Sequence, residues 1–169
     1  MSLHIERSLM VGPEAVAIIT GTFLSGTLMS LYSITMPVLV QTQKSTPLLL
    51  QQWAQIFYRG HVQGPALAIV TGTIYIYAAW AQAVSGGSWK PYAAASAFNF
   101  GIVPYTWIFM NRINTALFDA EAVTSNGKTA VEKERVNKMI VTWTRLHGVR
   151  SLLPLAGAVT GLLAMLRFI

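Results

Sequence analysis

The chain has 169 residues, of which 53% are hydrophobic and only 11% are charged, too few charges to cover an ordinary soluble domain. Its formal net charge of +6 does not indicate a nucleic-acid partner, because the Lys and Arg residues lie between long apolar runs and form no basic stripe. The absence of cysteine excludes disulfides, thiolate catalysis and Cys-ligated metal sites. We therefore expect a protein whose surroundings are the lipid bilayer.

Four segments carry no Lys, Arg, Asp or Glu, namely residues 15–43, 60–89, 91–111 and 151–166. A membrane-crossing helix needs about 20 consecutive residues with few charges. The sequence therefore predicts an all-α fold, which is an integral membrane four-helix bundle of up-down-up-down order. The predicted transmembrane helices cover about residues 13–40, 58–84, 91–112 and 145–167. They form a single membrane domain over residues 1–169.

The first predicted helix, 13–40, is longer than the ~7 to 15 apolar residues of a signal peptide, so we expect it to span the membrane. Small residues recur every four positions on the second, at Gly60, Gly64, Ala68 and Gly72, and indicate close helix packing. A similar pair on the last helix, Gly157 and Gly161, could also serve homodimerisation. We expect no functional site at these small residues.

Half of the charged residues lie in a polar connector at about 112–141, which contains a Ser125-Asn126-Gly127 turn and is expected to be exposed to water. In the predicted topology, nine of the twelve Lys and Arg residues fall on the side of this connector, and only Arg7, Lys90 and Arg167 fall on the other. By the positive-inside rule, the connector faces the cytosol and both termini face away from it.

The last charge-free segment has only 16 residues and is too short for a hydrocarbon core about 30 Å thick. Arg150 and His147 are therefore expected at or inside the membrane edge. Trp143, His147, Arg150 and Pro154 follow the spacing i, i+4, i+7, i+11 and share one helical face. Two ionisable groups at that depth favour a functional site over a structural role.

The other three helices present similar faces toward the cytosolic end, and that of the first predicted helix consists of Gly26, Ser30, Ser33 and Pro37. The third predicted helix carries Pro104, Trp107, Asn111 and Asn114, and the second carries Trp53, Phe57, His61 and Gly64. Each residue also has a structural interpretation, since tryptophans anchor helices at the membrane interface and asparagines cap or brace them. The convergence of these faces nevertheless predicts a pocket. His4 lies in the N-terminal tail and receives no role.

Three stretches resemble the small membrane anthrone oxygenases of fungal polyketide pathways. They are WAQIFYRGH at 53–61 with GPALA at 64–68, GIVPYTW at 101–107 with the Met110, Asn111 and Asn114 that follow, and WTRLHGVR at 143–150 with LPLAG at 153–157. The last stretch, with its Trp-x-x-x-His-x-x-Arg pattern, is the most specific. The resemblance covers roughly the second to fourth helices, whereas the first matches only in general character.

The resemblance implies oxidation of an anthrone by O₂ to an anthraquinone without metal or flavin, in the endoplasmic reticulum if the source is a fungus. In such a reaction either His61 or His147 would remove a ring CH₂ proton, since histidine titrates near neutral pH. Arg150 and Asn111 would stabilise the developing oxyanion or a peroxide. The hydrophobic aromatic substrate would lie between the remaining candidates, which are Trp107, Trp143, Tyr105, Trp53 near the mouth, Phe57 and Asn114.

Two other interpretations use the same residues. His61 and His147 could bind haem or copper across the bundle, although no third protein ligand for copper is evident. The chain could instead be a non-enzymatic lipid-binding or assembly protein. A cavity lined by both histidines and Arg150 would favour an enzyme, and a solid core would favour the non-enzymatic interpretation.

Overall fold

A computed structural model describes residues 12–125 and 131–169, and within these residues every regular element is helical. The expected all-α class is confirmed. His4, Arg7 and the expected turn at Asn126 and Gly127 lie outside the described residues.

Four helical lengths follow one another along the chain. The first consists of α2 (Pro13–Ser30), the π-helical turn η1 (Leu31–Thr35) and α3 (Met36–Thr42), and the second is α4 (Thr46–Val84). The third consists of α5 (Lys90–Phe100), α6 (Ile102–Tyr105), the π-helical turn η2 (Thr106–Met110) and α7 (Asn111–Ser125). The fourth is α8 (Lys133–Met165).

Proline marks the start of three of these lengths. Pro13, Pro47 and Pro91 occupy the first or second helical position of α2, α4 and α5. A proline there loses no hydrogen bond, because the first backbone N–H groups of a helix have no intrahelical acceptor, and its fixed φ already suits the helix. The helix starts are therefore specified locally by the sequence.

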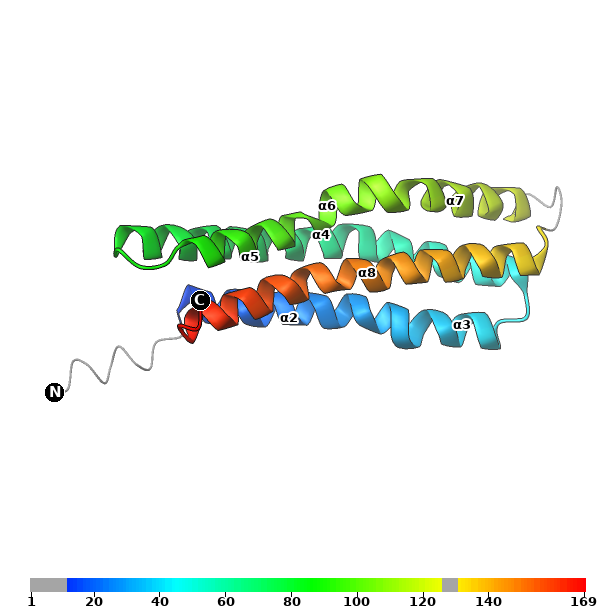
Figure 1. Cartoon of the computed structure of the whole chain (residues 1–169). Helices are drawn as coiled ribbons and strands as arrows, with labels where there is room; N and C mark the ends of the chain where they lie inside the picture. The colour runs from blue at the N-terminus through cyan, green and yellow to red at the C-terminus, as the bar shows by residue number, and fades with distance from the viewer. Residues whose placement is uncertain (1–11, 126–130) are drawn as a thin grey trace.

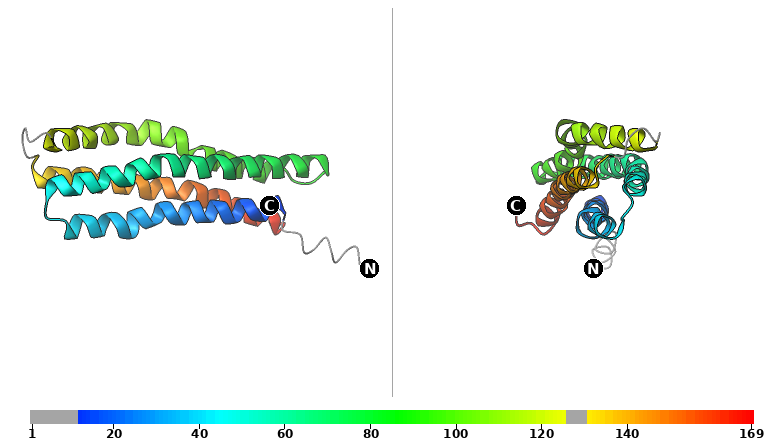
Figure 2. Two further views of the ribbon diagram at one scale, coloured as in Figure 1. Left: turned by 180° about the vertical axis from the view of Figure 1, so that it is seen from behind. Right: turned by 90° about the vertical axis from the view of Figure 1, so that its right-hand side faces the viewer.

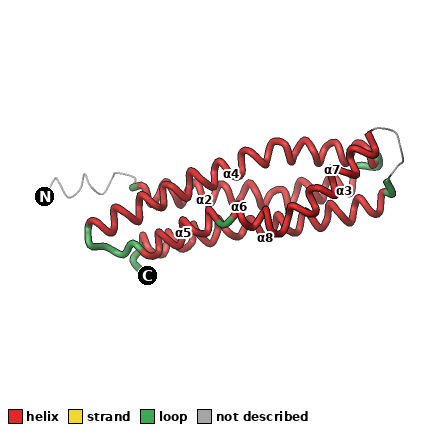
Figure 3. Tube along the Cα trace, turned by 90° about the horizontal axis from the view of Figure 1, so that it is seen from above, coloured by secondary structure: helices red, strands yellow, loops and turns green. Residues whose placement is uncertain are grey.

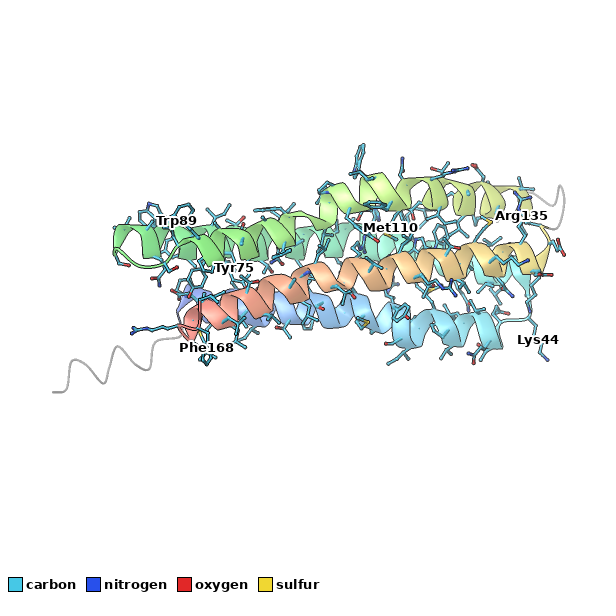
Figure 4. All side chains as sticks on the ribbon, in the orientation of Figure 1. Lys44, Tyr75, Trp89, Met110, Arg135 and Phe168 are labelled. Atoms are coloured by element: carbon cyan, nitrogen blue, oxygen red, sulfur yellow. The ribbon has the colours of Figure 1, made fainter. Side chains whose placement is uncertain are left out.

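The four lengths lie side by side over the whole molecule (Figures 1 and 2). Helix α2 packs against α4 and α8, and α5 packs against the same two helices. The start of α2, the loop after α4 and the C-terminus lie at one end of the molecule, as the tube in Figure 3 also shows. Figure 4 places Lys44 and Arg135 at the opposite end from Trp89 and Phe168.

Three helical lengths are long and apolar enough to cross a membrane, Pro13–Thr42, Thr46–Val84 and Lys133–Met165. The third length, residues 90–125, is not among them, because α5 ends at Phe100 and the stretch from Ile102 to Ser125 carries Arg112, Asp119 and Glu121. Gly101 separates α5 from α6, and Pro104, which has no N–H, cannot donate to the carbonyl of Phe100. Its course is visibly offset between α5 and α7 in Figure 1.

Helices α4 and α8 extend farther toward the charged end than the predicted spans at 58–84 and 145–167. Helix α4 has 39 residues and α8 has 33, which correspond to lengths of about 58 and 50 Å. Both exceed a hydrocarbon core of about 30 Å. Helical structure therefore continues through much of the sequence at 112–141, in α7 and in the first turns of α8.

The small residues of α8 pack inside the chain. A Cβ added at Gly157 would lie 2.6 Å from Asn99 Nδ2, and one added at Gly161 would lie 2.7 Å from Tyr75 Oη. Both glycines are buried. The expected dimer surface at this pair is therefore wrong, because α4 and α5 already occupy it.

We expect Gly161→Ala to destabilise the protein by about 1–3 kcal/mol, because the new methyl group overlaps the buried Tyr75 ring. The midpoint of SDS-induced unfolding in detergent micelles measures this loss. Gly26→Ala is the matched control, since a Cβ at Gly26 meets nothing within 4 Å. Equal midpoints for the two variants would contradict this packing.

Candidate active site

A cavity of about 600 Å³ lies among α2, α4, the segment from α6 to α7, and α8. Its lining includes His61, His147 and Arg150 together with aromatic and aliphatic side chains. The other polar residues that line it are Thr27, Gln63, Thr106, Asn111 and Asn114. Among the residues that the structure describes, no Asp or Glu lines the cavity, and Arg150 is the one permanently charged side chain that does.

His147 and Arg150 form a buried pair on α8, with exposed fractions of 5% and 6%. Arg150 Nη2 lies 3.3 Å from His147 Nδ1 and 3.5 Å from Nε2. A guanidinium only donates hydrogen bonds, so one of the two imidazole nitrogens accepts from it and is unprotonated. The His147 ring is therefore neutral in this arrangement, and its lone pair faces the guanidinium.

Thr106 of η2 fixes the other side of the guanidinium. Arg150 Nη1 donates to Thr106 Oγ1 at 3.0 Å, and the Thr106 hydroxyl donates to the Ile102 carbonyl at 2.8 Å. Arg150 Nε is buried and has no hydrogen-bond partner among the described residues. The cavity wall thus contains a positive charge, one of whose donors is unpaired and covered by protein atoms.

Trp143 positions the His147 ring. The two ring centroids lie 3.9 Å apart with a 44° tilt, and Trp143 is only 1% exposed. Its indole Nε1 donates to Asn114 Oδ1 at 2.9 Å, so the orientation of the indole is set by α7. Asn114 therefore acts on the imidazole through Trp143, in addition to lining the cavity.

His61 lies at the outer part of the cavity and is exposed. Its ring stacks on Phe57 at 5.3 Å with an 8° angle, and its Nδ1 lies 3.2 Å from the Phe57 carbonyl oxygen. Because a carbonyl only accepts, Nδ1 is the donor, and Nε2 of the neutral ring is left as an acceptor. The two histidines thus differ in burial and in partners.

The structure exchanges the expected positions of two tryptophans. Trp53, which the sequence places near the mouth, is 0% exposed and packs edge-on against Trp143 at 5.9 Å, outside the cavity lining. Trp107, expected to flank the substrate ring, lines the cavity but is 76% exposed. Trp107 is therefore the rim residue, and Trp53 supports Trp143 from the core.

The π-helical turn η2 explains the exposure of Trp107. A π-helix adds residues to each turn, so the inward positions from Ile102 to Asn114 recur every four residues, at Ile102, Thr106, Met110 and Asn114. The predicted face assumed the ordinary spacing of 3.6 residues. Trp107 consequently lies beside the inward face rather than on it.

Some of the remaining predicted site residues line the cavity and others do not. Phe57 lines the cavity, and so does Asn111, although its side chain is exposed. Tyr105 is not part of the lining, because it packs against the core and its hydroxyl donates to the Leu146 carbonyl at 3.3 Å. The structure thus brings His61, His147, Arg150, Asn111 and the aromatic rim together and leaves Tyr105 outside.

Sequence reasoning missed Thr106 and chose the wrong residues on the first helical length, because Gly26, Ser30, Ser33 and Pro37 do not line the cavity. Thr106 could be recognised only if the π-helical turn were known, because that turn directs it toward Arg150. Helix α2 contributes Phe23, Leu24, Thr27 and Leu28 to the lining, and these residue types are equally suited to contact with lipid. Composition and helical spacing contain no signal that separates the two uses.

No group of three or more His, Cys, Asp or Glu side chains that could hold a metal ion occurs in the described residues. The arrangement of the cavity defines a class of protein. It is an all-helical chain with membrane-length helices and an internal aromatic site that can bind a largely apolar ligand and stabilise one oxygen on it.

Comparison with known proteins identifies the family. The anthrone oxygenase family model matches residues 53–160, and the chain belongs to this family, as its resemblance predicts. The chain is therefore an oxygenase of the anthrone oxygenase family. No solved structure matches it.

Similar curated proteins come from several organisms. Monooxygenase hypC of Dothistroma septosporum is 43% identical over 159 residues, which cover 94% of this chain and 85% of that protein. Noranthrone monooxygenase of Aspergillus flavus is 42% identical over 160 residues, 95% of this chain and 76% of that protein. Anthrone oxygenase tpcL of Aspergillus fumigatus is 38% identical over 162 residues, 96% and 98% of the two chains.

Proposed function

We propose that this protein oxidises the ring CH₂ of an anthrone-type phenolic polyketide to the carbonyl of an anthraquinone, with O₂ as co-substrate and without metal or flavin. The observation that supports the proposal best is the buried His147–Arg150 pair in the wall of an aromatic cavity. The family and the names of its relatives, noranthrone monooxygenase and anthrone oxygenase, support the substrate class.

His147 acts as the general base in this proposal. The CH₂ protons of an anthrone are acidic because their loss gives an aromatic anthrolate. His147 is neutral in this arrangement and Trp143 fixes its ring, so its unprotonated nitrogen can take the proton once the substrate oxygen replaces it as the acceptor of Arg150. His61 lies on the exposed side of the cavity, where its role is to bind the outer edge of the substrate together with Phe57.

Arg150 stabilises the negative charge that forms when the proton leaves. The charge of the carbanion is delocalised onto the former ketone oxygen, and the guanidinium next to His147 is the only cation in the lining. Thr106 holds that guanidinium, so little reorganisation accompanies the reaction. Asn111 lies at the exposed edge of the same cavity and offers a second donor.

Oxygen then reacts with the carbanion. One electron passes from the anthrolate to O₂, and the resulting radical and superoxide combine at the former CH₂ carbon to form a peroxide. The second hydrogen on that carbon leaves as a proton, the O–O bond breaks, and hydroxide departs as water. The products are one quinone carbonyl and one water for each O₂ consumed, so no external reductant is required.

We place the protein as a multi-pass bundle of up-down-up-down order, with the third length also crossing the membrane and both termini on the non-cytosolic side. Exposed apolar side chains on all four lengths support contact with lipid, among them Ile19, Val70, Ile108 and Leu152. The charge-free part of α4, from residue 60, is about 37 Å long. In this placement the cavity lies near the cytosolic membrane edge, in the endoplasmic reticulum if the source is a fungus.

The haem and copper alternatives fit the residues less well. A metal ion bound to His147 would lie next to the permanent charge of Arg150, and His61 Nδ1 is engaged by the carbonyl of its own helix. The lipid-binding and assembly alternatives give no role to the buried His147–Arg150 pair in the cavity wall.

Incubation of the purified protein with a hydroxylated anthrone in air tests the proposal. We expect consumption of O₂ and formation of the quinone in equal amounts, well above the spontaneous rate, by protein without a Soret absorbance band. Turnover equal to the spontaneous rate would overturn the proposed substrate class, and activity that tracks haem or metal content would overturn the cofactor-free mechanism.

A further inference from the structure

We infer that Gly60 and Gly64 of α4 determine the size of the ring system that the site accepts. The inference rests on the proposed function, because it concerns the substrate of the same cavity. The two glycines lie one helical turn apart and both line the cavity, so this part of its wall consists of backbone without side chains.

The surroundings of these glycines differ from those of the packed glycines. A Cβ added at Gly72 would lie 2.9 Å from the Phe100 ring, and Gly161 is equally tight against Tyr75. A Cβ at Gly60 or Gly64 would meet nothing within 4 Å. Gly64 is nevertheless buried, so the open space beside it is the cavity itself.

A second observation indicates that this space receives a ligand. Arg150 lines the same cavity and is only 6% exposed. Its Nε donor has no partner among the described residues. Nε is covered by protein atoms here, so a bound oxygen atom would pair with it after a small shift of the Arg150 side chain and would recover the free energy that the unpaired donor costs. The glycine wall and the unpaired donor therefore belong to one binding site for an oxygen-bearing molecule.

The physical role of the glycines follows from the shape of a flat tricyclic ligand. A planar ring can approach a helix closely only where no Cβ projects from the backbone. A side chain at position 64 would project into the cavity and displace ligand rather than protein atoms. Larger residues here should therefore exclude three-ring compounds, admit two-ring compounds and leave the fold intact.

Gly64→Leu and the smaller Gly64→Ala test this role in the purified full-length chain, with Gly26→Leu as the matched control. Gly26 is also a helical glycine in open space, but it does not line the cavity. The probes are 1,8-dihydroxyanthraquinone, which has three rings and is not a substrate, and 1-naphthol, which has two. Binding is measured by quenching of tryptophan fluorescence.

We expect Gly64→Leu to raise the Kd of the three-ring probe by about tenfold or more and that of 1-naphthol by less than about threefold. Gly64→Ala should raise both Kd values by less, again with the larger increase for the three-ring probe. Gly26→Leu should bind both probes as the wild type does. Equal weakening of both probes, or an unchanged Kd for the three-ring probe, would overturn the inference. Because the assay needs no turnover, a wild type that binds the probe but does not oxidise anthrones would refute the proposed function alone.

Discussion

Replacing His147 with alanine is expected to lower kcat for anthrone oxidation by about 10²- to 10⁴-fold, the usual contribution of a general base. The imidazole is buried against Arg150 and Trp143, and no carboxylate lines the cavity to replace it. The initial rate of quinone formation, corrected for spontaneous oxidation, measures the loss. Added imidazole should restore part of the activity, because the truncation leaves room for it beside the cavity.

His61→Ala is the companion variant for this experiment. His61 is exposed and engages Phe57, so its loss should raise KM and change kcat by less than about fivefold, as expected for uniform substrate binding. If the large loss in kcat occurred in His61→Ala and not in His147→Ala, the assignment of the base would be reversed. Unchanged unfolding midpoints would show that both variants are folded.

Replacing Arg150 with lysine should lower kcat by about 10²- to 10³-fold, although the positive charge is retained. The guanidinium contacts Thr106 and His147 through two different nitrogens and still has Nε free. A single ammonium cannot reproduce this planar set of donors. Because the donors act on charge that develops during the reaction, the loss should fall on kcat more than on KM.

Arg145→Lys provides the control for this substitution. Arg145 lies on the same helix but is exposed, and it does not line the cavity. The same chemical change there should leave kcat within about twofold of wild type, in line with the small effects of surface substitutions. Near-normal kcat in Arg150→Lys would mean that charge alone suffices and that the fixed geometry around Thr106 is not needed.

The sequence predicts α8 well. Trp143, His147, Arg150 and Pro154 were placed on one inward face by a period of 3.6 residues, and all four are buried. The prediction succeeds because α8 is a continuous α-helix through this region. The short charge-free segment also drew attention to Arg150, whose burial inside the protein the structure shows and whose place at the membrane edge stays a prediction.

The third helix shows where such reasoning fails. Its face was placed with the same period, but the π-helical turn η2 shifts the inward positions, so that Thr106 and not Trp107 contacts Arg150. Nothing in local composition marks the extra residue. The prediction is therefore wrong about which positions of the helix face inward. It is right that polar and aromatic residues of this helix line the cavity.

The glycines illustrate a different limit. Equal spacing along α4 predicts close packing at Gly60, Gly64 and Gly72 alike, yet only Gly72 packs against a neighbouring side chain. A missing side chain can allow another helix to approach or can leave room for a ligand, and spacing does not distinguish the two. The distinction depends on tertiary arrangement, here on the distance of the other helices from the α4 backbone.

Exchange of the anthrone ring CH₂ hydrogens for deuterium without oxygen tests the central claim most directly, because it isolates proton removal from the later reaction with O₂. In D₂O under argon, wild-type protein should accelerate this exchange over the spontaneous rate, and His147→Ala should abolish the acceleration. Absence of enzymatic exchange in a wild-type preparation that oxidises anthrone in air would contradict the account, because the reaction would then not begin with removal of this proton by the protein.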